Sequence, residues 1–323
     1  MSSFSDMESQ VIAEQVVIAG IIVLTGTVGS WAKIITEQIR YAISRLVFNI
    51  TLPLLIVTTI SRMQMSHEVL VNGWWALVFT ILSFLLMYGF GKISSRMFRL
   101  PARSAVVHEL HTMFGNIVFL GFPLIAALYP EGESLLYASI YYMVSSFMQW
   151  TYAVFRLKGQ KDVPVRDRFK NLLNPNTVAF AVGILLFFIQ FQLPDLVFQP
   201  LRSIGNATSP LALLYIGATL AGTNLKGILK RYDIYVLSFN KLLLIPFVLL
   251  LIIKFFVKQI GIDFGDMPGT IIVLETAMPC MSMIVIMAKA YGGADDLASE
   301  NVFFTTVLSL LTLPVVYFLT TVV

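Results

Sequence analysis

Ten apolar segments, each close to the length of a membrane-crossing helix, run through this sequence of 323 residues. A helix needs about 20 apolar residues to cross the hydrocarbon core of a bilayer. Charged residues make up 12% of the chain, about half of the ~25% that soluble domains carry. Because backbone groups in hydrocarbon must hydrogen-bond within the chain, the sequence predicts an all-α integral membrane protein with ten transmembrane helices. The segments lie near 11–31, 41–60, 73–91, 104–128, 135–155, 175–193, 207–222, 234–257, 268–290 and 300–321.

Basic side chains gather in alternate connections between these segments. The most basic connection is 156–170, whereas intervening connections carry acidic residues such as Asp195 and Asp263. Because Lys and Arg are retained on the cytoplasmic side, we expect a multi-pass protein of the cell (plasma or inner) membrane with both termini extracytoplasmic. The pI near 9.1 then reflects topology, so the expected surroundings are the lipid bilayer and no nucleic acid is expected as a partner.

A short motif appears at corresponding places in the two halves of the chain. Asn49-Ile-Thr-Leu-Pro53-Leu in the second segment returns as Asn206-Ala-Thr-Ser-Pro210-Leu in the seventh. Five segments per half is an odd number, so the second half enters the membrane from the opposite side. We therefore expect two inverted five-helix repeats, residues 1–157 and 175–323, joined by a cytosolic linker at 158–174.

Two of the segments contain residues that interrupt helices. The fourth carries Gly115-Asn116 followed by Gly121 and Pro123, and the ninth carries Pro279. Gly lowers helix propensity and Pro removes a backbone donor. Interrupted helices at matching positions indicate the binding site of a secondary transporter. The alternative explanation is that Gly and Pro are commoner in all membrane helices.

The interruptions supply the candidate substrate-binding residues. A helix N-terminus presents unpaired N–H groups and a partial positive charge, which suits a carboxylate. Asn116 can add an amide donor, or its amide can act as an interhelical hydrogen bond that only supports packing. The asparagines of the repeated motif can face a ligand with their prolines, or they can satisfy carbonyls that the prolines free. The candidates are Thr112, Gly115, Asn116, Pro279, Cys280 and Ser282, with Asn49, Pro53, Asn206 and Pro210 as a second group.

Three ionisable residues within the segments are candidates for charge or proton coupling: His111, Lys241 and Glu275. Ionisable groups at membrane depth are costly and therefore point to function. Lys241 can bind an anion or carry a proton, or it can form a structural pair with Glu275. Glu275 can hold a proton or a cation. His111 titrates near neutral pH, or it is a solvated residue at the membrane interface.

The sequence lacks the motifs that several other classes of function require. The single cysteine, Cys280, excludes an internal disulfide, and three histidines form no metal-binding pattern. No phosphate-binding P-loop motif is present, and no paired-carboxylate or Ser-His arrangement is placed at membrane depth. We expect that the protein is not an enzyme and binds no metal and no cofactor. The candidate coupling ions are H+ and Na+.

The sequence resembles the auxin efflux carrier family, which includes PIN proteins and malonate-type carriers, over most of its length. The motifs that carry the resemblance are FNITLPLL (48–55), GNIVFLGFPLI (115–125), NPNTVAFAVGI (174–184), AMPCMSMIVIMAKAYGGADDLAS (277–299) and TTVLSLLTLP (305–314).

The resemblance implies a scaffold and dimer surface of helices 1, 2, 6 and 7, and a moving transport unit of helices 3–5 and 8–10. Helices 4 and 9 would be broken and would cross near the membrane centre. Asn116 matches the family's substrate-facing asparagine, and Pro279 matches the proline of the second crossover. Two departures from the plant carriers are the lack of a long central loop and Cys280, where plant members tend to carry glutamine.

We therefore expect a secondary transporter for a small organic anion, such as a mono- or dicarboxylate or an auxin-like acid, working by alternating access as a homodimer. The alternatives are a sodium-coupled symporter of the bile-acid type, for which Glu275, Thr276 and Ser282 form a sparse ligand set, and a non-enzymatic membrane sensor.

Overall fold

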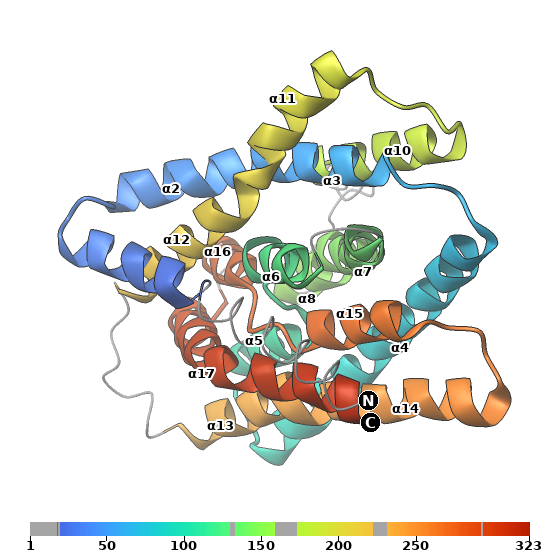
Figure 1. Ribbon diagram of the computed structural model, residues 1–323. Helices are drawn as coiled ribbons and strands as arrows, with labels where there is room; N and C mark the ends of the chain where they lie inside the picture. The colour runs from blue at the N-terminus through green and yellow to red at the C-terminus, as the bar shows by residue number, and fades with distance from the viewer. Residues whose placement is uncertain (1–17, 19, 130–132, 159–172, 222–230, 292) are drawn as a thin grey trace. The chain divides into compact units, whose positions relative to one another are not determined.

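The computed structural model describes residues 18, 20–129, 133–158, 173–221, 231–291 and 293–323. Within these residues every regular element is a helix, apart from one isolated β-bridge (Figure 1). The all-helical class expected from the sequence is confirmed for this part of the chain. The start of the first expected span and most of the linker at 158–174 lie outside the described residues.

Four described helical stretches are long and apolar enough to cross a membrane: Glu37–Ile60, His67–Met97, Tyr232–Ile260 and Asp295–Val322. Shorter apolar helices occupy Gly20–Trp31, Ile117–Leu128, Pro175–Phe188 and Ser282–Tyr291. These findings agree with a membrane protein, while the count of ten spans in two inverted repeats stays a prediction.

The described chain divides into two compact units, and each unit takes segments from both halves of the sequence. Unit 1 contains residues 1–64, 118–135 and 178–223, and unit 2 contains residues 65–117, 136–177 and 224–323.

Unit 1 is a set of short helices. Its elements are Gly20–Trp31, α2 (Glu37–Leu46), η1 (Val47–Thr51), α3 (Leu52–Ile60), α6 (Phe122–Leu128), most of α10 (Pro175–Phe188), α11 (Asp195–Asn206) and α12 (Thr208–Leu220). Figure 1 shows α11 packed across α3. The end of this contact is held by an ion pair between Arg62 and Asp195, with the Arg62 guanidinium over the Phe198 ring.

Two glycines in unit 1 allow a close backbone approach. A Cβ placed on Gly217 of α12 would lie 1.8 Å from the Val23 carbonyl oxygen, and one on Gly26 would lie 2.2 Å from the Leu214 carbonyl oxygen. The Thr27 hydroxyl donates to the Gly217 carbonyl at 3.0 Å. Membrane helices lack a hydrophobic driving force for association, so small residues that permit close packing hold them together.

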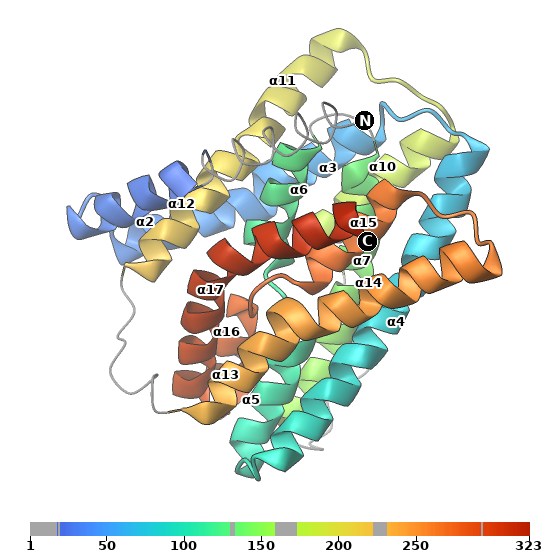
Figure 2. The same ribbon diagram turned by 60° about the horizontal axis from the view of Figure 1, so that its bottom comes forward.

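Unit 2 contains the longer helices. They are α4 (His67–Met97), α5 (Ala102–Met113), α7 (Ser134–Met148), η3 (Gln149–Ala153), α8 (Val154–Lys158), α13 (Tyr232–Phe239), η5 (Asn240–Leu244), α14 (Ile245–Phe255), η6 (Phe256–Ile260), α15 (Asp266–Thr276), α16 (Ser282–Tyr291) and α17 (Asp295–Val322). Figure 2 shows α4 and α5 side by side. The helix α17 packs against α5, α13, α15 and α16.

Three π-helical turns each end two residues before a proline. They are η1 before Pro53, η2 (Ile117–Gly121) before Pro123, and η5 before Pro246. Proline cannot donate to the carbonyl four residues back and its ring clashes with that carbonyl, so the preceding turn widens. At Pro53 the result is a π-turn within the continuous helical stretch Glu37–Ile60. At the second motif, α11 ends at Asn206 and α12 begins at Thr208, with Ala207 between them in a right-handed helical conformation, three residues before Pro210.

Candidate functional site

The two interrupted segments meet in unit 2 as crossing stretches of extended backbone. The helix α5 ends at Met113 and Phe114 is extended, while α15 ends at Thr276 and α16 begins at Ser282. Between these helix ends, Gly115 pairs with Cys280 in an antiparallel β-bridge. We call residues 114–116 and 277–281 the backbone crossing.

Backbone hydrogen bonds join the two strands of the crossing. The Asn116 amide donates to the Pro279 carbonyl at 2.7 Å, and the Met281 amide donates to the Phe114 carbonyl at 3.1 Å. A Cβ on Gly115 would lie 2.8 Å from the Met278 Cβ, so the approach requires glycine. Breaking both helices at the same place lets each supply the backbone partners that the other has lost.

The crossing is also anchored to α17 and α5. The Cys280 amide donates to the Thr305 hydroxyl at 3.0 Å, and that hydroxyl donates to the Asn301 carbonyl at 2.7 Å. The Cys280 thiol lies 3.6 Å from the His111 carbonyl oxygen. These contacts fix the conformation of the crossing from two neighbouring helices.

Thr305→Val is expected to lower the free energy of unfolding, because the substitution keeps the side-chain shape but leaves the buried Cys280 amide without its acceptor. An unsatisfied buried group costs about 1–3 kcal/mol. Thermal unfolding in detergent should show this loss, while Thr321→Val should change stability by less than ~0.5 kcal/mol, since Thr321 is exposed and bonds only within its own helix. Equal thermal unfolding midpoints for the two variants would contradict the role of Thr305 in anchoring the crossing.

The crossing carries the features that favour an anion. The helix α16 starts directly after it at Ser282, which is half-buried, and the first amides of a helix have no partner within the helix. Asn116 lies on the opposite strand and is 5% exposed. Thr112 is fully buried and its hydroxyl donates to the His108 carbonyl at 2.9 Å, so this hydroxyl is engaged within α5.

The second group of candidates lies in unit 1. Asn49 is exposed, and its amide donates to the Arg45 carbonyl at 2.8 Å within its own helix. Asn206 and Pro210 are also exposed, and Pro53 is half-buried at the start of α3. The structure therefore gathers Gly115, Asn116, Pro279 and Cys280 at one place, and it places the members of the repeated motif in the other unit.

The three candidates for coupling are all fully buried in unit 2. Lys241 lies in η5, where its ammonium contacts the Met87 sulfur at 3.3 Å. Among the residues that the structure describes, neither carboxyl oxygen of Glu275 has a hydrogen-bond partner. His111 is 0% exposed rather than solvated, and its Nδ1 lies 3.2 Å from the Asn301 amide nitrogen.

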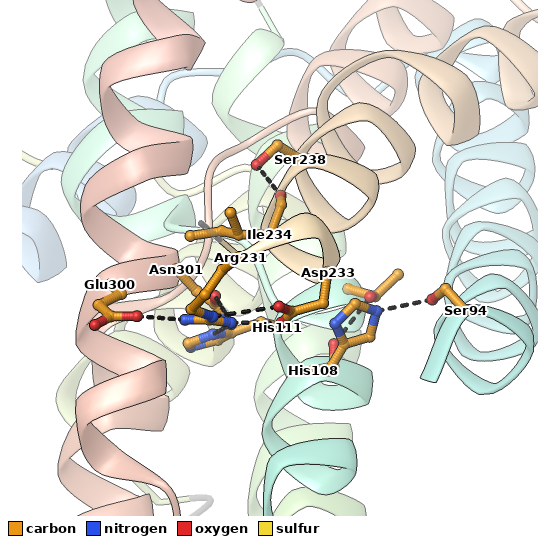
Figure 3. A network of polar contacts seen from close by, with 10 residues as sticks. Ser94, His108, His111, Arg231, Asp233, Ile234, Ser238, Glu300 and Asn301 are labelled. Carbon is orange, nitrogen blue, oxygen red and sulfur yellow. Dashed lines mark hydrogen bonds and ion pairs between the residues drawn. The ribbon is translucent and has the colours of Figure 1, made fainter. Parts of the chain in front are cut away.

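The sequence interpretation missed two ion-pair clusters at the ends of unit 2 helices. Glu109 is bound by Lys92 at 2.9 Å and by Arg156 at 2.6 Å. Arg231 binds both Asp233 and Glu300, from α13 and α17 (Figure 3). Apart from Arg231 and Asp233, which are two residues apart, the paired charges are distant in the chain, so local sequence does not reveal them. Among the residues that the structure describes, no group of three or more His, Cys, Asp or Glu side chains is placed to hold a metal.

The sequence is similar to those of membrane transport proteins. The profile of a family described as membrane transport protein matches residues 11–317. An uncharacterized transporter of Methanocaldococcus jannaschii is 25% identical over 315 residues, covering 92% of this chain and 94% of that protein. An uncharacterized transporter of Methanothermobacter thermautotrophicus is 24% identical over 304 residues, covering 91% of this chain and 93% of its own.

The match extends over nearly the whole chain and includes both strands of the backbone crossing. The names of the relatives indicate a transporter rather than an enzyme. The resemblance to the auxin efflux carriers noted from the sequence motifs is thereby confirmed at the level of the family. The chain belongs to the membrane transport protein family.

Proposed function

We propose that this protein is a secondary transporter that carries small organic anions across the cell membrane through a site at the backbone crossing. The observation that carries the proposal is the pairing of Gly115 with Cys280 between four helix ends in a membrane transport protein. Interrupted membrane helices place backbone dipoles and polar side chains where a solute can reach them.

An anion is favoured by the chemistry of the crossing. The α16 N-terminus carries about half a positive charge, and a helix N-terminus stabilises a nearby anion by ~0.3–1 kcal/mol, or up to ~2 kcal/mol when partly buried. Asn116 adds a side-chain amide that can donate. A single carboxylate fits these donors, and a second carboxylate or an aromatic ring would extend away from them. This supports mono- and dicarboxylates and auxin-like acids as the substrate class.

Alternating access supplies the transport step in this proposal. The crossing, α16 and the buried Lys241 all belong to unit 2, so we assign the carrier role to unit 2 and the scaffold role, with the dimer surface, to unit 1. Only one set of binding groups is then needed, because the same crossing faces each side of the membrane in turn.

Uptake into proteoliposomes tests the proposal. The probes are labelled acetate, lactate, malonate, succinate and indole-3-acetate, each with and without an imposed sodium gradient, against protein-free liposomes. We expect saturable uptake of at least one acid that does not require sodium. Uptake that depends strictly on sodium would support a bile-acid-type symporter instead, and failure of every acid would overturn the anion proposal in favour of another solute or a sensor role.

A further inference from the structure

Glu275 is buried in unit 2 without the partners that a buried charge normally has. Neither of its carboxyl oxygens accepts or donates a hydrogen bond within the described part of the chain. It interacts electrostatically with Lys241, but this pair is absent from the direct ion pairs of the described residues. A bare carboxylate buried in this way is strongly disfavoured. Glu275 is therefore most stable here as the neutral acid, which holds a proton.

Arg231 and Asn301 together fix the state of the His111 ring (Figure 3). Arg231 donates to the Asn301 side-chain oxygen at 3.3 Å, which directs the Asn301 amide nitrogen to His111 Nδ1 at 3.2 Å. Because the amide nitrogen donates, Nδ1 accepts, and the neutral ring carries its proton on Nε2. This Nε2 is buried and makes no well-formed hydrogen bond to the described residues, with the Met281 backbone beside the ring. The ring is thus held at Nδ1, while its proton-bearing nitrogen has no strong hydrogen bond.

A second histidine with one unpaired ring nitrogen lies one turn earlier on α5. His108 Nε2 is 2.8 Å from the Ser94 hydroxyl, while His108 Nδ1 is buried without a hydrogen-bond partner among the described residues. Residues three apart on a helix lie on the same face, and the two rings interact electrostatically. In Figure 3 both histidines come from α5 and lie close to Arg231, which precedes α13, and to Asp233 of α13.

The cluster of Arg231, Asp233 and Glu300, which lies close to the two histidines (Figure 3), is partly exposed to water. The side chains of Arg231, Asp233 and Glu300 are 20%, 12% and 29% exposed, at the end of unit 2 that the positive-inside rule predicts to be cytoplasmic. Burial opposes the charge of the Arg231 guanidinium, but its hydrogen bonds to Asp233 and Glu300 raise its pKa overall, so it remains a cation.

The charged and titratable groups that face each member are the following. His108 faces Asp233, Arg231 and Glu109; His111 faces His108, Lys241 and Arg231; Lys241 faces Glu275 and Cys280; and Glu275 faces Lys241 and Tyr141.

We propose that Glu275 is a proton-carrying site, that His108 and His111 relay protons between it and the partly exposed Asp233–Arg231 end, and that anion transport at the crossing is coupled to this proton. The coupling rests on the proposed function. In each cycle Glu275 takes up one proton as the neutral acid and releases it on the other side. After release, the Lys241 ammonium balances the carboxylate. One proton moving with one monocarboxylate makes the step electrically neutral.

The coupling is tested with the acid that proteoliposome uptake identifies. A gradient of one pH unit should drive about tenfold accumulation by wild-type protein, since one proton per acid transfers ~1.4 kcal/mol. Glu275→Gln keeps the shape of the neutral acid, so it should lose accumulation but retain exchange of labelled for unlabelled acid at equal pH. Glu68→Gln, at an exposed glutamate, should behave as wild type. Accumulation of the acid by Glu275→Gln under the pH gradient, or wild-type uptake that does not depend on the pH gradient, would overturn the coupling.

The proton site itself is tested without any substrate, by infrared spectra of the reconstituted protein after a switch to heavy water. Glu275→Gln should remove a protonated carboxyl band that Glu68→Gln retains. Exchange of that band should slow by about tenfold or more in His111→Phe and in the milder His111→Gln, since positioned acid–base groups speed proton transfer by ~10²–10⁴-fold.

His67→Phe, at an exposed histidine, should leave the exchange rate unchanged. A spectrum in which Glu275→Gln removes no band, or an exchange rate that both His111 variants leave unchanged, would overturn the proton path. If no acid moves in the uptake assay, the proposed function fails, and the infrared measurement still decides whether Glu275 holds a proton reached through His111.

Discussion

Asn116→Asp is expected to abolish uptake of the transported acid, while Asn116→Ala is expected to reduce kcat/KM by about 10- to 100-fold. A hydrogen bond to a charged group contributes ~1.5–3 kcal/mol, and each ~1.4 kcal/mol is a factor of ten. The aspartate is the same size as asparagine, but it replaces an amide donor with a negative charge at the crossing, where Asn116 is almost fully buried. Like charges at short range then oppose binding of the anion. Initial rates of uptake into proteoliposomes measure both effects.

The two variants also report the sign of the substrate's charge. A cationic substrate would bind better beside the introduced carboxylate, so Asn116→Asp would keep or raise its transport. Gln259→Ala, which removes an exposed amide, serves as the matched control and should transport at the wild-type rate. Wild-type uptake by Asn116→Ala would show that the amide does not contact the substrate.

Gly217→Ala is expected to destabilise unit 1 by more than the ~1–3 kcal/mol that overpacked sites usually cost. The added Cβ would lie 1.8 Å from the Val23 carbonyl oxygen and 3.0 Å from the Thr27 amide nitrogen. Both are backbone atoms of helix Gly20–Trp31, so no side-chain rotation relieves the clash and the two helices must separate. The expected result is a large drop in the thermal unfolding midpoint in detergent, with low yield of folded protein.

Gly89→Ala provides the matched control on α4. A Cβ at Gly89 meets no atom within 4 Å, so the alanine should raise stability by ~0.5–1 kcal/mol through its better helix propensity. If Gly217→Ala melts at the wild-type temperature or above, the close packing of helix Gly20–Trp31 on α12 is wrong.

Much of the local structure follows from residue chemistry alone. The interruptions at Gly115 and Pro279 and the widened turns before Pro53 and Pro123 follow from missing donors and low helix propensity. The helix α11 was missed, because Gln199, Pro200 and Arg202 lower its hydropathy and place it outside any apolar segment.

Tertiary contacts were harder to infer. Asn301 and Thr305 anchor the crossing and orient His111, yet each is only a polar residue in the last expected span. Nothing local shows that they face α5 and Cys280, which are distant in the sequence. The burial of His111 likewise depends on helices α13 and α17 packing against α5, so its sequence position at the start of a span misleadingly indicated an interfacial residue.

The most direct measurement of the substrate's location uses the single cysteine of the chain, Cys280, which lies in the crossing and is fully buried. A membrane-permeant maleimide can reach it only during the openings that alternating access requires, and no second thiol contributes background. We expect a saturating concentration of the transported acid to slow alkylation of Cys280 by about tenfold or more, as occupancy of a site protects it by mass action, while an acid that is not transported has no effect. Alkylation at the same rate with and without the transported acid, or no alkylation while transport proceeds, would contradict a substrate site at the backbone crossing.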